Sequence, residues 1–217
     1  MSSDAEYARE VAEEEGAWGF VIYRCTYKSD DEWSRFLQIL NATVREALEA
    51  EDEVEDEGYV GLMDTLDWSV QEDLELEGAR KHEVRRRFRQ WASENSGSNS
   101  CRGKFCIMVD QACVDATLSA PAPPQYDREG KAFVYIIDKA WRQKYADGSY
   151  AADEADSQAS EGKEPADEGF PPVDGCRMDD VGWMKLAITH VAPRAFSVLE
   201  EPGWEGTYHR PPATVKP

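Results

Sequence analysis

The clearest pattern of hydrophobic and polar positions lies between residues 19 and 48. The stretch GFVIYRCTY (19–27) is rich in β-branched and aromatic residues, and it places apolar side chains on both faces. This pattern predicts an interior strand that is covered on two sides. The apolar spacing then changes to three and four residues, which predicts an amphipathic helix over 29–48. Ser29 and Glu32 have the spacing of a capping box at the start of this helix.

Three later segments repeat the strand pattern, at 104–110, 131–138 and 182–192. Residues 80–94 predict a second amphipathic helix, because their apolar residues recur at spacings of four and three. Short helices are expected after the second and fourth strands. This order predicts a single α+β domain over 16–204, in which helices pack on a mixed sheet of about four main strands. A ferredoxin-like sandwich and an α+β barrel both fit the pattern.

Three segments are expected to lie outside the packed sheet. Residues 1–15 are polar and acidic and predict a flexible arm, and 205–217 predict a Pro-rich tail. Residues 145–172 are acidic, low in complexity and nearly devoid of large aliphatic side chains. Such a segment buries too little surface to offset its ordering entropy, so it predicts a disordered acidic insertion.

The charge balance changes the picture of partners. A formal net charge of -20 repels phosphate backbones and anionic membranes, so we expect no nucleic-acid and no membrane partner. The N-terminus lacks the apolar core of a signal peptide, and no apolar run is long enough to cross a bilayer. Five cysteines without regular spacing do not indicate a secreted disulfide framework. We therefore expect a soluble, cytoplasmic protein, with a nuclear location left open.

The helix over 80–94 concentrates positive charge in an otherwise acidic chain. Arginine forks suit carboxylates and phosphates, so this helix is a candidate site for an anion or an acidic partner. The residues proposed to bind are Arg80, Arg85, Arg86 and Arg89. The alternative is that its basic residues pair with the protein's own acidic loops, 49–57 and 71–77, or line a solvated face.

A candidate catalytic group is suggested by polar residues at strand ends. Asp110 and Asp138 close the second and third predicted strands, and His190 lies near the end of the fourth. If those ends converge, a His–carboxylate dyad could act as a general base. Tyr135, in the third strand, is a further candidate in such a site. A single histidine near a strand end is more often structural, which is the competing interpretation.

Other kinds of site find no support in the pattern. The chain has no C-x-x-C pair, and none of its three histidines has a ligand spacing from the cysteines, so no metal site is predicted. No P-loop, Rossmann glycine fingerprint or catalytic signature is present, and no cofactor is predicted. Six of the seven tryptophans border predicted strands or helices, which favours core packing, with an aromatic-lined pocket as the alternative.

Four stretches of the chain together carry a resemblance. They are GFVIYRCTYKSDDEWSRF, LDWSVQEDLELEGARKHEVRRRFRQW, KAFVYIIDKAW and GWMKLAITHVAPRAF. They resemble a large group of uncharacterised proteins from filamentous fungi, and they cover most of the chain outside the insertion and termini. The resemblance implies a fungal, non-secreted protein with several ordered segments. It carries over no activity and no functional residue.

These observations lead to one functional hypothesis and two alternatives. The leading hypothesis is a binding protein for a protein partner or a small molecule, since catalytic motifs are missing and aromatic residues are abundant. The first alternative is a cofactor-independent enzyme of fungal specialised metabolism with an aromatic-lined pocket, which requires an apolar cavity within reach of His190, Asp110 or Tyr135. The second is an acidic mimic of nucleic acid. Whether the protein is an enzyme is left open.

Overall fold

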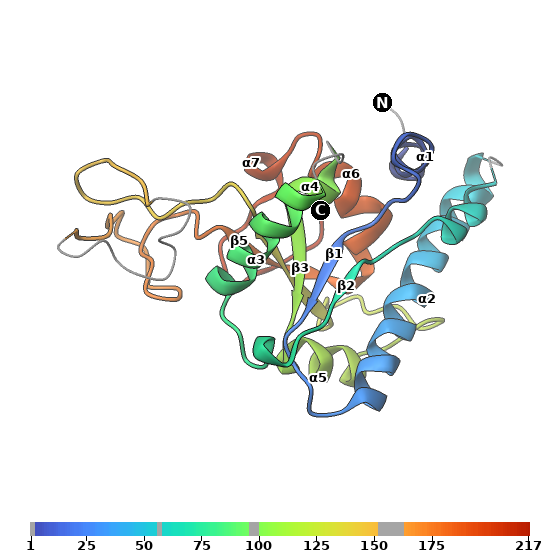
Figure 1. The fold of residues 1–217 in the computed structure, drawn as a ribbon. Helices are drawn as coiled ribbons and strands as arrows, with labels where there is room; N and C mark the ends of the chain where they lie inside the picture. Colours follow the sequence, from blue (N-terminus) through green and yellow to red (C-terminus); the bar gives the residue numbers. More distant parts are fainter. Residues whose placement is uncertain (1–2, 56–57, 96–99, 152–162) are drawn as a thin grey trace.

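A mixed sheet of six strands forms the centre of the molecule (Figure 1). The structure is a computed structural model that describes residues 3–55, 58–95, 100–151 and 163–217. The strand order is β2-β1-β3-β4-β5-β6. The strands are β1 (Val21–Arg24), β2 (Val70–Gln71), β3 (Phe105–Val109), β4 (Phe133–Asp138), β5 (Trp183–Ala187) and β6 (Thr214–Val215).

The four long strands lie within the segments that their residue patterns predict, so the mixed α+β sheet is confirmed. The count of about four strands is corrected to six, because β2 and β6 add two-residue edges. Strands β1, β2 and β3 are mutually parallel, β4 is antiparallel to β3 and β5, and β6 is parallel to β5. This linear, partly parallel order matches neither a ferredoxin-like sandwich nor a closed barrel.

Helices cover both faces of the sheet. The α-helices are α1 (Asp4–Glu15), α2 (Asp30–Glu55), α3 (Lys81–Glu94), α4 (Cys101–Lys104), α5 (Gln111–Ser119), α6 (Phe196–Val198) and α7 (Trp204–Thr207). Shorter helical segments are η1 (Tyr59–Asp64), η2 (Leu74–Leu76), η3 (Ile188–His190) and η4 (Val191–Ala195).

The two long helices lie on opposite faces. Tyr23 of β1 meets Phe88 of α3, with ring centroids 6.4 Å apart, so α3 covers the face that carries Tyr23. The Phe20 side chain points to the other face of the sheet, where its ring packs edge-on against Phe196 of α6, with centroids 5.3 Å apart. Helix α2 contacts η3 and η4, which precede α6, so α2 covers this second face. The chain thus passes from β1 through α2 to β2 on one side, and from β2 through α3 to β3 on the other.

This winding creates a topological switch point. The connections that follow β1 and β2 lead to helices on opposite faces of the sheet, so the switch point lies between the carboxyl ends of these two strands. Open α/β sheets bind ligands at such points, since no connection covers the strand ends there.

Both termini pack on the fold, which corrects the predicted arm and tail. Residues 1–15 contain α1, whose Ser3 side chain caps the helix start and whose Ala5 and Ala8 are fully buried. Small residues three positions apart form a narrow apolar stripe that is easily hidden among acidic neighbours. Within 205–217, β6 pairs with β5 and α7 is completed.

The predicted disordered insertion at 145–172 lies partly outside the described residues. Its described flanks, 145–151 and 163–172, carry bridges such as Tyr145 with Pro165, and Tyr145 is buried. Disorder is therefore not supported for these flanks. The first long helix also continues beyond its expected end at residue 48, and its acidic last turns form part of α2.

Candidate ligand-binding cavity

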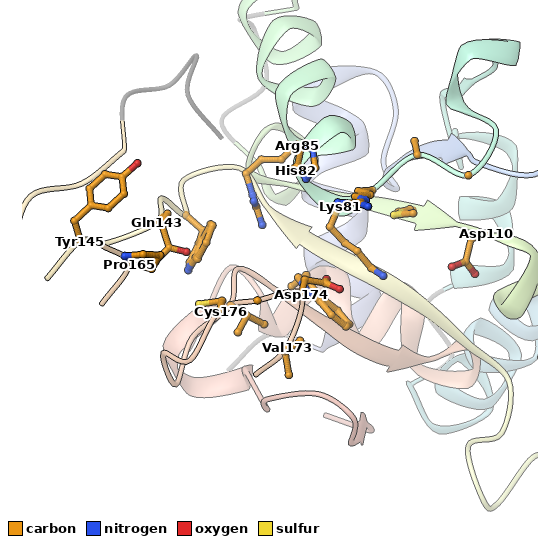
Figure 2. A pocket seen from close by; sticks show the side chains of 18 residues that line it. Lys81, His82, Arg85, Asp110, Gln143, Tyr145, Pro165, Val173, Asp174 and Cys176 are labelled. Carbon is orange, nitrogen blue, oxygen red and sulfur yellow. The ribbon is translucent and has the colours of Figure 1, made fainter. Parts of the chain in front are cut away.

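A cavity of about 720 Å³ opens on the face of the sheet covered by α3, beside the start of that helix (Figure 2). We call it the α3 cavity. It is lined by 78–82 at the entry to α3, by Met108 and Asp110 at the end of β3, by Trp183 at the start of β5, and by loop residues from 141–145 and 173–176. Five segments far apart in sequence therefore contribute to one hollow.

Met108 and Trp183 of the sheet line one wall of the cavity, and the Tyr135 ring packs beside that wall. Met108, Tyr135 and Lys185 lie opposite one another across β3, β4 and β5, and so share a face. The Tyr135 ring meets Trp183 edge-on, with centroids 5.4 Å apart. The Lys81 Nζ atom lies 4.3 Å from the centroid of the Tyr135 ring and 4.6 Å from that of Trp183. Lys81, from the first turn of α3, thus rests on two aromatic rings.

Arg85 holds the opposite wall in place. Its side chain is 2 % exposed; Nε donates to the Asp138 carbonyl at 2.9 Å and Nη2 donates to the Gly182 carbonyl at 2.8 Å. Its guanidinium also lies 4.6 Å from the centroid of the Trp141 ring. Gly182 has φ of +72°, and a Cβ atom there would collide with the Trp141 ring. Arg85 therefore acts as an internal strut, and not as the free anion-binding group that the sequence predicted.

A tight turn places two further side chains at the cavity. Asp174 and Gly175 have φ of +49° and +84°, and Val173 and Cys176 exchange two backbone hydrogen bonds of 2.9 Å. This is the geometry of a two-residue hairpin, for which Asp-Gly is a strong sequence signal. The Asp-Gly pair at 174–175 is thus a local sequence signal for this turn, which the periodic pattern of apolar residues does not reveal. As a result, Asp174 and Cys176 were missed as cavity residues.

Asp110 and Tyr135, two of the predicted site residues, lie close together. Asp110 caps α5, since its carboxylate accepts a hydrogen bond from the Cys113 amide at 3.1 Å. Burial raises the pKa of Tyr135, and the nearby Cys113 and Asp110 raise it further. The phenol is therefore protonated throughout the neutral range. Tyr135 lies beneath Lys81 and does not itself line the cavity.

The predicted dyad of His190 with a strand-end carboxylate is not assembled. Phe105 pairs with Asp138, so Asp138 lies at the opposite end of the sheet from Asp110; antiparallel strands end in opposite directions. His190 lies in η3, with Nδ1 2.9 Å from the Thr189 hydroxyl. Burial lowers the pKa of His190, and Lys216 and Arg194 lower it further. Within the described residues, His190 contacts neither carboxylate and does not line the α3 cavity.

Three of the basic residues on α3 are satisfied by the protein itself. Arg86 pairs with Glu83 at 2.7 Å on the solvated side of the helix. Arg87 pairs with Asp73 at 2.6 Å and also reaches Glu75, so the expected pairing with the acidic loop 71–77 is confirmed for this residue. Arg89 donates to the backbone carbonyls of Lys139 and Trp141, at 3.0 Å and 2.7 Å.

Arg80 and Lys81 differ from the rest of the helix. Neither makes an ion pair or a side-chain hydrogen bond with any residue that the structure describes, and both line the α3 cavity. Of the four arginines proposed from sequence, Arg80 is thus the one that faces the cavity with its charge unpaired. Lys81 was not among the proposed residues, since spacing alone did not distinguish it from its basic neighbours.

The cysteines give no sign of a metal or redox site. All five are buried and free, and burial raises the pKa of Cys101, Cys106 and Cys113. Raised values keep these thiols protonated and unreactive. No group of three or more potential metal ligands occurs among the residues that the structure describes.

Comparison with known proteins adds no assignment. No family model, no curated protein and no solved structure matches the chain. The resemblance to filamentous-fungal proteins therefore stays a prediction. Among the described helices, none is long and apolar enough to cross a membrane.

Proposed function

We propose that the protein binds a small molecule in the α3 cavity. The observation that carries the proposal is the cavity itself, whose volume of about 720 Å³ falls within the roughly 300–1,000 Å³ of ligand pockets. Its walls combine the aromatic side chains of Trp141, Tyr145 and Trp183 with charged and polar groups that can orient a ligand.

Binding is favoured over catalysis by the placement of Tyr135. A cofactor-independent enzyme would need a substrate atom to reach a proton donor or acceptor, and Tyr135 is 6 % exposed beneath Lys81. Asp110 reaches the cavity, but its carboxylate is engaged in capping α5. The enzyme alternative and the acidic mimic therefore stay predictions without a specific contact in their favour.

The test is a small-molecule screen against the whole protein and a variant with a filled cavity. Val173→Trp places a large ring at the cavity, at a partly buried position next to the turn at Asp174 and Gly175. Leu74→Trp is the matched control, because Leu74 is 75 % exposed and lies outside the cavity. Compounds detected by thermal shift and confirmed by calorimetry should bind the Leu74 variant normally.

The Val173 variant should bind the same compounds at least about ten-fold more weakly, since filling the site removes their contacts. Its circular dichroism and melting temperature should stay close to those of the unmodified protein. A screen without confirmed binders, or binders that are indifferent to Val173→Trp, would refute the proposal.

A further inference from the structure

The charges that face the α3 cavity indicate which chemical class of ligand it takes. From them we infer that the ligand is an aromatic carboxylic acid, with its carboxylate at Lys81 and Arg80 and its ring among the aromatic side chains that line the cavity. The inference rests on the proposed function, because it specifies the occupant of the same cavity.

Lys81 supplies the main argument. Its ammonium group lies over the ring faces of Tyr135 and Trp183. A ring face attracts the positive charge but is not a conventional hydrogen-bond acceptor for the N–H groups. No carboxylate of the described residues lies within ion-pair distance of it. The donors of Lys81 therefore remain available to an anion in the cavity. Figure 2 shows the side chain extending into the hollow from the start of α3.

Arg80 adds a second unpaired cation next to the first. It immediately precedes α3 and lines the same cavity. The contrast with Arg86 and Arg87 on the same helix is informative, because those two are held by carboxylates of the protein. In a chain with 44 acidic and 24 basic residues, leaving both cavity cations unpaired favours an external anion.

The balance of charge favours a carboxylate over a phosphate. Three cations, Arg80, Lys81 and Arg85, and two carboxylates, Asp110 and Asp174, line the cavity, which leaves one net positive charge. The donors of Arg85 already bind two backbone carbonyls. A monoanion balances this site, whereas the second charge of a phosphate would face the two carboxylates.

The remaining walls favour an aromatic body with a hydrogen-bond donor. Trp141, Trp183 and Tyr145 line the cavity together with apolar side chains, and aromatic rings pack well against such walls. The Asp174 carboxylate accepts no hydrogen bond from the residues that the structure describes. It is therefore available to a hydroxyl or amine of the ligand, on a different side of the cavity from Tyr145 (Figure 2).

The test compares acids with neutral molecules of the same shape. The probes are 4-hydroxybenzoate, 4-hydroxyphenylacetate and indole-3-acetate, each paired with its primary amide, together with phenyl phosphate and acetate. Titration calorimetry with the full chain should show at least one aromatic acid binding about ten-fold or more tightly than its amide, because a hydrogen bond to a charged group is lost in the amide. Acetate and phenyl phosphate should bind more weakly than that acid.

Variants assign the effect to the cavity cations. Lys81→Gln should weaken the best acid by about ten- to hundred-fold and leave its amide unchanged, and Lys81→Arg should restore most of the affinity. Arg86→Gln is the matched control on the same helix and should change neither, because Arg86 pairs outside the cavity. Melting temperatures show whether each variant is folded. If the Lys81→Gln variant does not fold, the comparison of acid and amide binding by the Lys81→Arg variant still decides the test.

Equal binding of acid and amide, no binding by any acid, or an acid that is indifferent to Lys81→Gln would overturn the inference. The proposed function fails separately. If neutral compounds from the screen bind and are lost in Val173→Trp, the cavity is a ligand site and its proposed chemistry is wrong.

Discussion

Replacing Arg85 tests whether this buried arginine holds the cavity wall. Arg85→Met removes two hydrogen bonds from a charged donor and the stacking contact with Trp141. Each such hydrogen bond contributes about 1.5–3 kcal/mol, and a desolvated cation–π contact about 2 kcal/mol. The side chain is 2 % exposed, so solvent cannot replace these contacts without opening the wall.

Part of this loss is recovered. Methionine fills much of the same volume, and the folded state no longer bears the cost of a buried charge, which is several kcal/mol. The carbonyls of Asp138 and Gly182 lose their charged partner, which adds a smaller penalty. We therefore expect a net loss of about 2–4 kcal/mol in the free energy of unfolding, or about 5–15 °C in Tm for a chain of this length.

Urea unfolding, followed by tryptophan fluorescence and circular dichroism, measures this loss. The matched control is Arg86→Met, one residue along the helix, whose side chain is 46 % exposed and pairs with Glu83. An exposed pair of this kind contributes about 0–1 kcal/mol, so the control should change stability by less than about 1 kcal/mol. Equal costs for the two substitutions would refute the reasoning, since they would show that the buried contacts of Arg85 add nothing.

Two further predictions concern the same region. Gly182→Ala should lower the free energy of unfolding in urea by more than about 2 kcal/mol, because φ is +72° and the new Cβ meets the Trp141 ring. Gly148→Ala is the control, because φ there is +82° but the space around it is open, and it should lower the free energy of unfolding by about 1 kcal/mol. A similar cost at both sites would contradict the collision. Hydrogen bonds from Arg86 and Arg87 lower the pKa of Glu83 from its usual 4.5 to about 2. Ionised Glu83 therefore stabilises the folded state above about pH 4.5, and this contribution to stability is lost as the pH falls towards 2. Glu83→Gln should accordingly lower Tm at pH 7, and the difference should shrink between pH 4.5 and 2; a constant difference would count against it.

Sequence periodicity predicted the elements whose stability is decided locally. The strand and helix between residues 19 and 48 were recognisable because buried positions recur at two and then at about 3.6 residues. The helix cap at Ser29 also depends only on near neighbours in sequence, because the Ser29 hydroxyl accepts a hydrogen bond of 3.2 Å from the Glu32 amide. By contrast, β2 and β6 are two residues long and exist because a neighbouring strand offers backbone partners. No pattern within two residues encodes such a pairing.

The candidate site shows the same division. Sequence identified a basic helix and an acidic residue after the second predicted strand, and both reach the α3 cavity. It did not separate the unpaired Arg80 and Lys81 from the satisfied Arg85, because that distinction depends on carbonyls 53 and 97 residues away from Arg85. It also allowed His190 as a partner for strand-end carboxylates, which the strand directions rule out for Asp138.

The sequence by itself determined the two long helices, the long strands and the excess of negative charge, since each depends on composition or on neighbours within a few residues. Tertiary structure alone decided the strand order, the switch point and the α3 cavity, whose walls come from segments up to about a hundred residues apart. Whether a charged side chain is free to bind a ligand depends on which groups the fold brings within about 4 Å of it. Periodicity carries no information about those distances.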